Sequence, residues 1–439
     1  MSNQATVPAS TGIGAPSNGA SPASLERSPG AAAPGQQAQR IPFTRASSVA
    51  AMQDATLSAL APGVATQVNL LTNAFLAYII LNVQVVTSAN AATVKWNADG
   101  PYNILGAAGV QLTDPSNQAI VTAISGFKLA QLNKFLADTG CNFDPSRDPN
   151  FAMLPSAANN GAGSSAATAG SASFRLVIPV ENRRRDALGA LTNSAANEQM
   201  HLIITPAASF GAGTDTENNV YSTAPTTLPT LNIQVWQMYW TSPPAVIVSG
   251  GSSVPTARTP SGLGTVGYVR AERHAEIAGG GSAPFQLSSV GDVITNINWT
   301  LRTSTTLNTR ATYAAAQTFN AGYAGSWPST FNLAINDFTV LALGQDMWLR
   351  ELARFFDCWS GVSAQAGSPG ALDAGVFSLA PFWRGLFDGN YNFDPAGQYL
   401  ATEAGTKIQV RDTVWGASAA YLEVDVRILS PESGASLYA

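Results

Sequence analysis

The first half of the chain consists of short apolar runs separated by turn-forming residues. The runs are rich in β-branched and aromatic side chains, which is typical of β-strands. The predicted strands between about Gln67 and Pro243 are Phe75–Val86, Asn103–Leu112, Phe174–Val180, His201–Thr205 and Leu231–Trp240. Two connections, Pro155–Ser173 and Pro206–Pro229, are long and rich in small residues, so we predict loops there. The pattern predicts an all-β fold with long loops.

The same pattern resumes in the second half. The predicted strands are Val293–Arg302, Thr330–Leu343, Lys407–Val414 and Tyr421–Leu429. The last strand alternates, so that one face carries Leu422, Val424, Val426 and Ile428 and the other carries Glu423, Asp425 and Arg427. The longest apolar segment, Val68–Val86, is interrupted by several Asn, Thr and Gln residues. It therefore predicts a strand or strand pair in preference to a membrane-spanning helix.

Composition divides the chain into four parts. Residues 1–45 contain almost no large apolar side chain and predict a flexible N-terminal arm. Residues 242–267 are rich in Pro, Gly and Ser and predict a linker. Two tandem β units with short helices and long loops fit jelly-roll sandwiches. We predict a first jelly roll at residues 46–241 and a second at residues 268–439.

The two halves resemble distant copies of one unit. Tyr102-Asn103-Ile104 opens a predicted strand that precedes an amphipathic helix at Ser125–Asp138, and Phe331-Asn332-Leu333 precedes a second helix at Gln345–Asp357. Chance is the alternative, because one such triplet carries little information. Duplication predicts two separate, superposable sandwiches with Ile104 and Leu333 at corresponding strand positions.

Charge and reactive residues narrow the function classes. Charged residues make up 11% of the chain, the net charge is −5 and only four lysines are present, which argues against a sequence-specific nucleic-acid surface. Two cysteines, Cys141 and Cys358, and two histidines, His201 and His274, are too few for a disulfide framework or a metal centre. No nucleophile elbow, phosphate-binding loop or secretory signal is present. We predict a protein that is not an enzyme and has no cofactor.

One charged cluster is a candidate contact site. Arg183, Arg184 and Arg185 form the densest charge in the chain and are flanked by Glu181 and Asp186. The flanking carboxylates favour a subunit contact or a local ion pair over a nucleic-acid patch. Trp236, Trp240 and Trp299 lie in predicted strands, where core packing competes with stacking on sugars.

Three segments carry a family resemblance: Asp99–Leu105, Asp114–Gln118 and Ser125–Asn133. They resemble the major capsid proteins of tectiviruses, the membrane-containing icosahedral phages, in which Gly-Pro-x-Asn-aliphatic, Asp-Pro-x-Asn-Gln and Ser-Gly-x-x-Leu recur in this order. The likeness is weaker across the rest of residues 65–430. It implies a double jelly roll that forms homotrimers with six pseudo-equivalent corners and tiles an icosahedral shell, made in the host cytoplasm.

The resemblance also implies partners: other trimers, vertex and minor capsid proteins, and an internal membrane reached by the N-terminal arm. This arm is rich in Pro and Gly, in contrast to the partly helical arm of the family, so membrane contact stays open. The alternatives are a β-sandwich adhesin that binds glycans and a carbohydrate-active jelly-roll enzyme. The first lacks an export signal, and the second lacks a carboxylate pair in a strand context.

Overall fold

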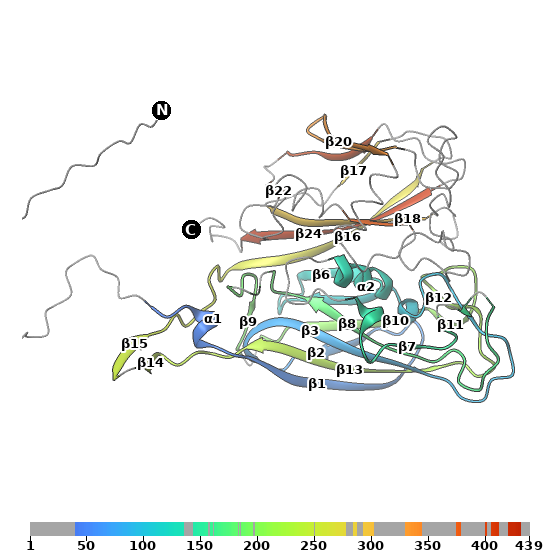
Figure 1. Cartoon of the computed structure of the whole chain (residues 1–439), viewed down its shortest axis with the longest axis horizontal. Helices are drawn as coiled ribbons and strands as arrows, with labels where there is room; N and C mark the ends of the chain where they lie inside the picture. Colours follow the sequence, from blue (N-terminus) through green and yellow to red (C-terminus); the bar gives the residue numbers. More distant parts are fainter. Residues whose placement is uncertain are drawn as a thin grey trace, which may run out of the picture. The chain divides into compact units, whose positions relative to one another are not determined.

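Strands are the main type of secondary structure in the described part of the computed structural model (Figure 1). Its described residues are 40–135, 144–156, 159–160, 162–182, 184, 186–195, 198–249, 251–277, 284–287, 293–302, 330–344, 375–378, 400–401, 405–411 and 420–431. Within the unit Arg40–Ala439, the strands form two tandem sandwiches, as expected for a double jelly roll. The predicted helix Gln345–Asp357, both cysteines, Arg183 and Arg185 lie outside the described residues.

The first half packs a six-stranded sheet against four strands of a second sheet. The six strands are β1 (Val49–Leu60), β13 (Thr230–Trp240), β3 (Asn73–Val86), β8 (Ala172–Pro179), β7 (Ala152–Met153) and β9 (Leu191–Asn193). The four facing strands are β2 (Thr66–Asn69), β10 (His201–Pro206), β5 (Leu105–Thr113) and β6 (Ala119–Ile124). Alternation in β3 buries Ile79, Leu81, Val83 and Val85, so its apolar face lies in the core. The strands predicted in this half are confirmed, except that the one predicted at Asn103–Leu112 begins at Leu105.

The second half repeats this plan with fewer described strands. One sheet holds β16 (Thr265–Ile277), β24 (Ala420–Pro431), β18 (Val293–Arg302), β21 (Val376–Ser378) and β22 (Leu400–Ala401). The other holds β17 (Phe285–Gln286), β23 (Ile408–Arg411), β19 (Thr330–Ile335) and β20 (Phe338–Gly344). The predicted segment Thr330–Leu343 is a hairpin, because Asn336 and Asp337 both adopt positive φ and turn the chain between β19 and β20.

The two sandwiches are joined through one continuous sheet. Strand β6 of the first half pairs in parallel with β16 of the second at Val121 and Val269, so nine strands form one sheet. Thr122 strengthens this junction, because its Oγ1 accepts a hydrogen bond from the Ala271 N–H at 2.8 Å. The prediction of two separate sandwiches is therefore wrong. Ile104 also lies in the short 3-10 helix η1 (Tyr102–Ile104), whereas Leu333 lies inside β19, so these residues do not correspond.

One predicted helix is confirmed, but it is buried on all sides and not on one face as an amphipathic helix would be. Helix α2 spans Gly126–Phe135, and Ser125 caps it by accepting the Lys128 N–H at 3.2 Å. All ten residues are buried, so the helix is enclosed and has no exposed polar face. Gly126 is required at the start, since a Cβ there would lie 2.2 Å from the Tyr102 carbonyl oxygen. The helix contacts β5 and β8 of the first half and β18 of the second.

Several elements escaped prediction. Strand β1 was not predicted, and the loop predicted at Pro206–Pro229 contains β11 (Ser209–Ala212) and β12 (Asn219–Thr223), which pairs with β4 (Lys95–Trp96). These strands are composed largely of small and polar residues, so they lack a strong apolar alternation. The short strands β2, β6, β7 and β9, the long strand β16 and the 3-10 helix η2 (Pro145–Arg147) were not predicted either, and a hairpin lies within residues 242–267.

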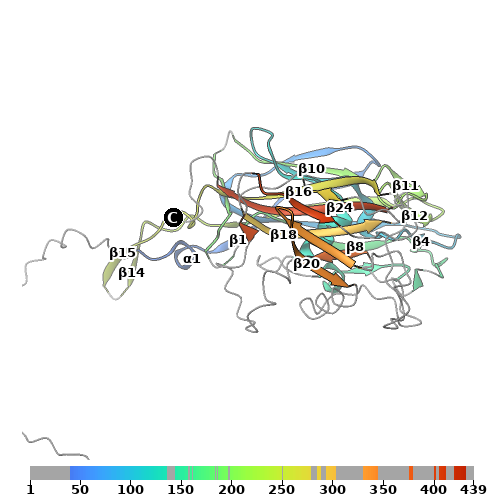
Figure 2. The same cartoon turned by 90° about the horizontal axis from the view of Figure 1, so that it is seen from above.

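That hairpin consists of β14 (Val246–Ser249) and β15 (Ser252–Pro255), which form a sheet of their own. It lies near helix α1 (Phe43–Ala46) in both views (Figures 1 and 2). Ile41 connects the two elements, because its N–H donates to the Pro255 carbonyl at 2.9 Å and its carbonyl accepts from the Ala257 N–H at 2.9 Å. Phe43 is buried against Phe75 and Trp240, so residues 41–46 are packed against the first sandwich.

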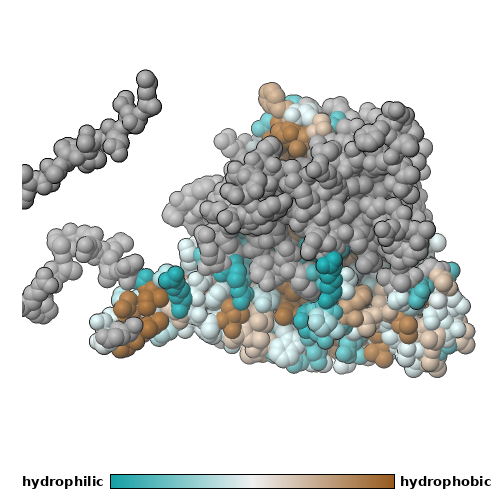
Figure 3. All heavy atoms as spheres, viewed as in Figure 1, coloured by the Kyte–Doolittle hydropathy of each residue, from teal (hydrophilic) through white to brown (hydrophobic). Residues whose placement is uncertain are grey.

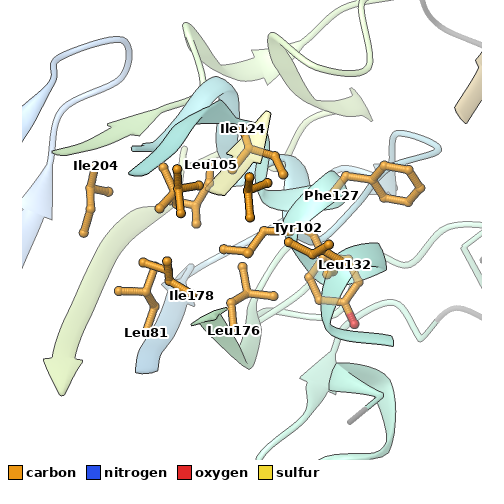
Figure 4. Close-up of a cluster of buried hydrophobic side chains, with 14 of the residues drawn as sticks. Leu81, Tyr102, Leu105, Ile124, Phe127, Leu132, Leu176, Ile178 and Ile204 are labelled. Atoms are coloured by element: carbon orange, nitrogen blue, oxygen red, sulfur yellow. The ribbon is translucent and has the colours of Figure 1, made fainter. Parts of the chain in front are cut away.

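The core of the first sandwich is almost entirely apolar. Leu81, Leu176 and Ile178 approach from the six-stranded sheet, and Leu105, Ile124 and Ile204 approach from the facing strands (Figure 4). Phe127 and Leu132 belong to α2 itself, and Tyr102 comes from η1, which contacts this helix (Figure 4). All nine side chains are at most 6% exposed, which makes burial of this cluster the main stabilising contribution in this half.

Candidate functional site

Among the described residues, no three His, Cys, Asp or Glu side chains are arranged to hold a metal ion. His201 Nδ1 lies 3.0 Å from Asn69 Oδ1 on the neighbouring strand, which is an ordinary strand contact. An open depression of about 400 Å³ is lined by uncharged residues, Asn97, Ala212, Gly213, Thr214 and Ser222. No helix among the described residues is long and apolar enough to cross a membrane.

The most highly charged region is instead buried between the two sandwiches. We call it the ionic layer, and it consists of the side chains of six buried residues: Asp99, Lys128, Glu217, Arg302, Glu423 and Asp425. The first three come from the first half and the last three from β18 and β24 of the second half. The contacts between these side chains therefore link residues of the two halves.

Arg302 is the centre of the ionic layer. Its Nη2 lies 2.8 Å from Asp99 Oδ2 and 3.7 Å from Glu217 Oε1, and its Nε lies 3.0 Å from Glu423 Oε2. Burial alone would lower the pKa of the guanidinium, but Asp99, Glu423 and Glu217 raise the pKa overall. Arg302 is therefore charged, and it pairs with two carboxylates of the first half and one of the second.

Lys128 adds a second cation from helix α2. Its Nζ lies 3.9 Å from Glu423 Oε2 and 3.8 Å from Asp425 Oδ1. Four carboxylates thus share two cations. The pKa of Asp425 is raised overall to about 6. Burial is the largest cause and raises the pKa, Lys128 lowers it and Glu423 raises it. Asp425 therefore binds a proton at a higher pH than an exposed aspartate does.

Backbone contacts extend the interface on both sides of the ionic layer. Arg427 Nη2 donates to the Glu181 carbonyl at 2.8 Å, which links β24 to the end of β8. Asn296 Nδ2 donates to the Phe135 carbonyl at 3.2 Å, which links β18 to the last turn of α2. On the other side of the helix, Asn133 exchanges two hydrogen bonds with the Val177 backbone, at 2.6 and 2.8 Å. Helix α2 is thus fixed to both halves through side-chain amides.

Arg184 is the one described member of the predicted arginine site. It makes an ion pair within its own subunit, 3.1 Å from Glu181 Oε1, and its guanidinium lies 5.0 Å from the Trp240 ring centroid. Glu181 is fully buried and also accepts the Trp240 Nε1–H at 2.7 Å. About a third of the Arg184 side chain remains exposed. The structure does not bring Arg184 to the ionic layer.

The segments that carry the family resemblance have structural roles. Asp99 belongs to the ionic layer, and the Asn103 amide donates to the carbonyls of Thr216 and Asn219 at 2.8 and 2.9 Å. Asp114 accepts the Gln118 N–H at 2.7 Å across a turn in which Asn117 has a φ of 64°. These residues therefore fix one loop, one turn and the start of α2.

Comparison with solved structures identifies the fold. No protein-family model matches the sequence, and neither does any curated protein. The structure is similar to the STIV major capsid protein, with a TM-score of 0.50 and 13% identity over 87% of this chain and 96% of that one. It is also similar to the capsid of PBCV-1 virus, with a TM-score of 0.52 and 10% identity over 89% and 96% of the two chains.

A further match is the structure of Sulfolobus Turreted Icosahedral Virus, with a TM-score of 0.50 and 11% identity over 88% of this chain and 92% of that one. These matches cover both sandwiches. They confirm the predicted fold class, an all-β double jelly roll.

Proposed function

We propose that this chain is the major capsid protein of an icosahedral virus, located in the shell of the virion. The observation that carries the proposal is the double jelly roll itself, shared over nearly the whole length with capsid proteins whose sequences are only 10–13% identical. Its role is structural, so no catalytic group is required. The physical basis is repetition, since two tandem sandwiches give a trimer six similar corners for a hexagonal lattice.

The ionic layer suits such a role. A shell subunit must present its two sandwiches at a fixed angle, because an error in one tile is repeated in every contact. Buried ion pairs add little net stability, but they penalise alternative packings that leave a charge unpaired. The contacts of Arg302 and Lys128 across the interface thus favour one rigid arrangement of the two halves.

The finer assignment is a tectivirus-type capsid protein of a bacteriophage. Its support is the motif order in Asp99–Leu105, Asp114–Gln118 and Ser125–Asn133. We further propose homotrimers, vertex and minor capsid proteins as partners, and the N-terminal arm as the segment that meets an internal membrane if the virion contains one. We also propose the predicted division into arm 1–45, first jelly roll 46–241, linker 242–267 and second jelly roll 268–439, with two adjustments. Residues 41–46 pack against the first sandwich, so the free arm is proposed to end before residue 41, and the linker contains the hairpin β14–β15 and the first residues of β16.

Expression of the full chain followed by sedimentation and electron microscopy tests the function. We expect trimers and larger closed or sheet-like assemblies. A chain that stays monomeric at every concentration and salt condition would contradict the proposal. Binding to a glycan array by such a monomer would instead support the adhesin alternative.

The arginine site is proposed as a subunit contact. Arg184 is anchored by Glu181 and Trp240, and this fixes the segment while about a third of the Arg184 side chain remains exposed. The test replaces Arg183, Arg184 and Arg185 together by Ala and follows the trimer by sedimentation at low and high salt. Loss of the trimer supports the contact, and an unchanged trimer at every salt concentration rejects it.

A further inference from the structure

The hairpin β14–β15 has one strand edge with no partner in the described part of the chain. It forms a two-stranded sheet, and such a hairpin is only marginally stable in water without further contacts. Its base is nevertheless fixed, because Thr256 Oγ1 donates to the Pro244 carbonyl and Ile41 forms two backbone hydrogen bonds beside β15. A fixed base with an open edge is a preorganised docking element.

The hydrogen-bond pattern shows which groups face the open edge. The Thr256 N–H donates to the Ala245 carbonyl at 3.1 Å, so Ala245 faces β15. Because antiparallel strands alternate, Ile247 also faces β15, and the N–H and C=O groups of Val246 and Val248 point outward. The outward position of the Pro255 carbonyl, which accepts from Ile41, agrees with this alternation.

The side chains at this edge are apolar and unprotected. Val246 is 49% exposed and Val248 is 70% exposed. Hydrophobic residues gather at the surface around the hairpin (Figure 3). Residues 242–257 contain no charged side chain. Proteins usually protect a free edge with charge or a bulge, and edge strand β1 has both, with Asp54 and two bulges. Strand β14 has neither.

We propose that the edge of β14 pairs with β14 of a second copy of this chain. An antiparallel pair centred on Ile247 sets Val246 opposite Val248 in both copies, and all four outward-facing residues then form hydrogen-bonded pairs. The valines of both copies meet on one face of the resulting four-stranded sheet. Such a two-fold contact is self-complementary and cannot lie within a three-fold trimer, so it joins neighbouring trimers. In this respect the inference rests on the proposed function.

A neutral partner fits better than a charged one. The edge offers no charge to attract a lipid headgroup or a phosphate, whereas a second copy supplies the same apolar strand. Four-residue strands give a weak contact, so repetition over a shell is what makes the pairing effective.

Disulfide trapping tests the pairing. At the two-fold axis the Ile247 Cα atoms of two copies would be about 4.5 Å apart, a distance that a disulfide spans. Ile247→Cys in the full chain, oxidised in assembled particles, should give covalent dimers on a non-reducing gel. Ser253→Cys, on the other strand of the hairpin, is the matched control, and the unmodified chain controls for Cys141 and Cys358. Particles of Ile247→Cys that yield no more dimer than these controls would overturn the pairing.

A second variant acts on the hydrogen bonds. Val248→Pro removes one outward N–H and should abolish or strongly reduce particles while trimers remain, whereas Val248→Thr keeps the N–H and should assemble. Normal assembly of Val248→Pro would count against the pairing. If the unmodified chain forms neither trimers nor particles, the proposed function fails separately. Oxidation of concentrated Ile247→Cys then decides the pairing alone, since dimers support it and monomers reject it.

Discussion

The two faces of strand β24 are both buried, yet they are held by different forces. One face carries Val424 and Val426, which are fully buried in the hydrophobic core of the second sandwich. The other carries Glu423 and Asp425, which are equally buried but lie in the ionic layer. An alternating strand normally has one buried face and one solvated face. Here the charged face of β24 is covered by the first sandwich. The alternation of apolar and charged residues along β24 therefore separates the hydrophobic core of the second sandwich from the ionic layer.

The difference predicts how each face responds to mutation. Loss of an apolar group from the core leaves a cavity, and its cost depends on volume. Loss of one charge from the ionic layer leaves the opposite charges buried without compensation, and its cost depends on protonation and on neighbouring charges. The ionic layer should therefore be more sensitive to single substitutions and to pH.

Removal of the central cation should have the largest effect. Arg302→Ala leaves Asp99, Glu217 and Glu423 in a buried region with Lys128 as the one remaining cation of the layer. We expect a loss of about 4 kcal/mol in the free energy of unfolding, measured by urea denaturation. Arg147→Ala is the control, because that side chain is 61% exposed and its loss should change stability by less than about 0.5 kcal/mol. Equal effects of the two variants would contradict the role of Arg302.

A cavity on the apolar face should lower the free energy of unfolding somewhat less than the loss of Arg302 does. Ile297 of β18 is fully buried in the hydrophobic cluster, and Ile297→Ala should lower the free energy of unfolding by about 3 kcal/mol. Ile297→Val should cost about 1 kcal/mol. The difference between Ile297→Ala and the unmodified chain should stay constant between pH 4 and pH 7, since no ionisable group is removed. A pH-dependent difference would show that the two faces are coupled.

These contrasts explain what the sequence could predict. Strands such as β3 and β13 and the helix α2 follow from local periodicity, because their apolar residues recur at the spacing of one secondary structure. Strand β1 has few bulky residues and two bulges, so its pattern is weak. The fold class could also be predicted from these patterns, but the pairing of β6 with β16 could not, because one parallel pair leaves no periodic signal.

The ionic layer was missed for a different reason. Asp99 and Arg302 are 203 residues apart, and no local pattern pairs them. The enclosed position of α2 was missed too, since Lys128 and Lys134 suggest a solvated face but are paired with carboxylates in the interior. The one available signal was three charged residues on one face of an otherwise apolar strand in a chain with only 11% charged residues.

The pH dependence of stability further distinguishes the ionic layer from the apolar face of β24. The pKa of Asp425 in the folded protein is about 6, above the usual 3.8, so the folded state binds this proton more tightly than the unfolded state. Its contribution to stability is present below about pH 4 and is lost as the pH rises toward 6, by about 1–3 kcal/mol. Thermal unfolding of Asp425→Asn should lack this component. Burial also raises the pKa of Asp54 to about 6, so Asp54 contributes to the pH dependence of stability with the same sign. Asp54→Asn is therefore measured in parallel. An unchanged pH profile in Asp425→Asn would reject this assignment.

The smallest effect is expected at Arg184, where a charge lies at the surface and not between the sandwiches. Its ion pair with Glu181 is partly exposed and therefore screened, and its guanidinium stacks on Trp240. Arg184→Ala should lower the free energy of unfolding by about 1 kcal/mol, with a smaller difference at high salt. Arg184→Lys keeps the charge but loses the planar stacking group, so it should recover only part of this loss. The buried Glu181 carboxylate keeps one partner in both variants, because Trp240 Nε1–H still donates to it. A loss of stability as large as that of Arg302→Ala would instead show that Arg184 and Glu181 behave like the buried charges of the ionic layer.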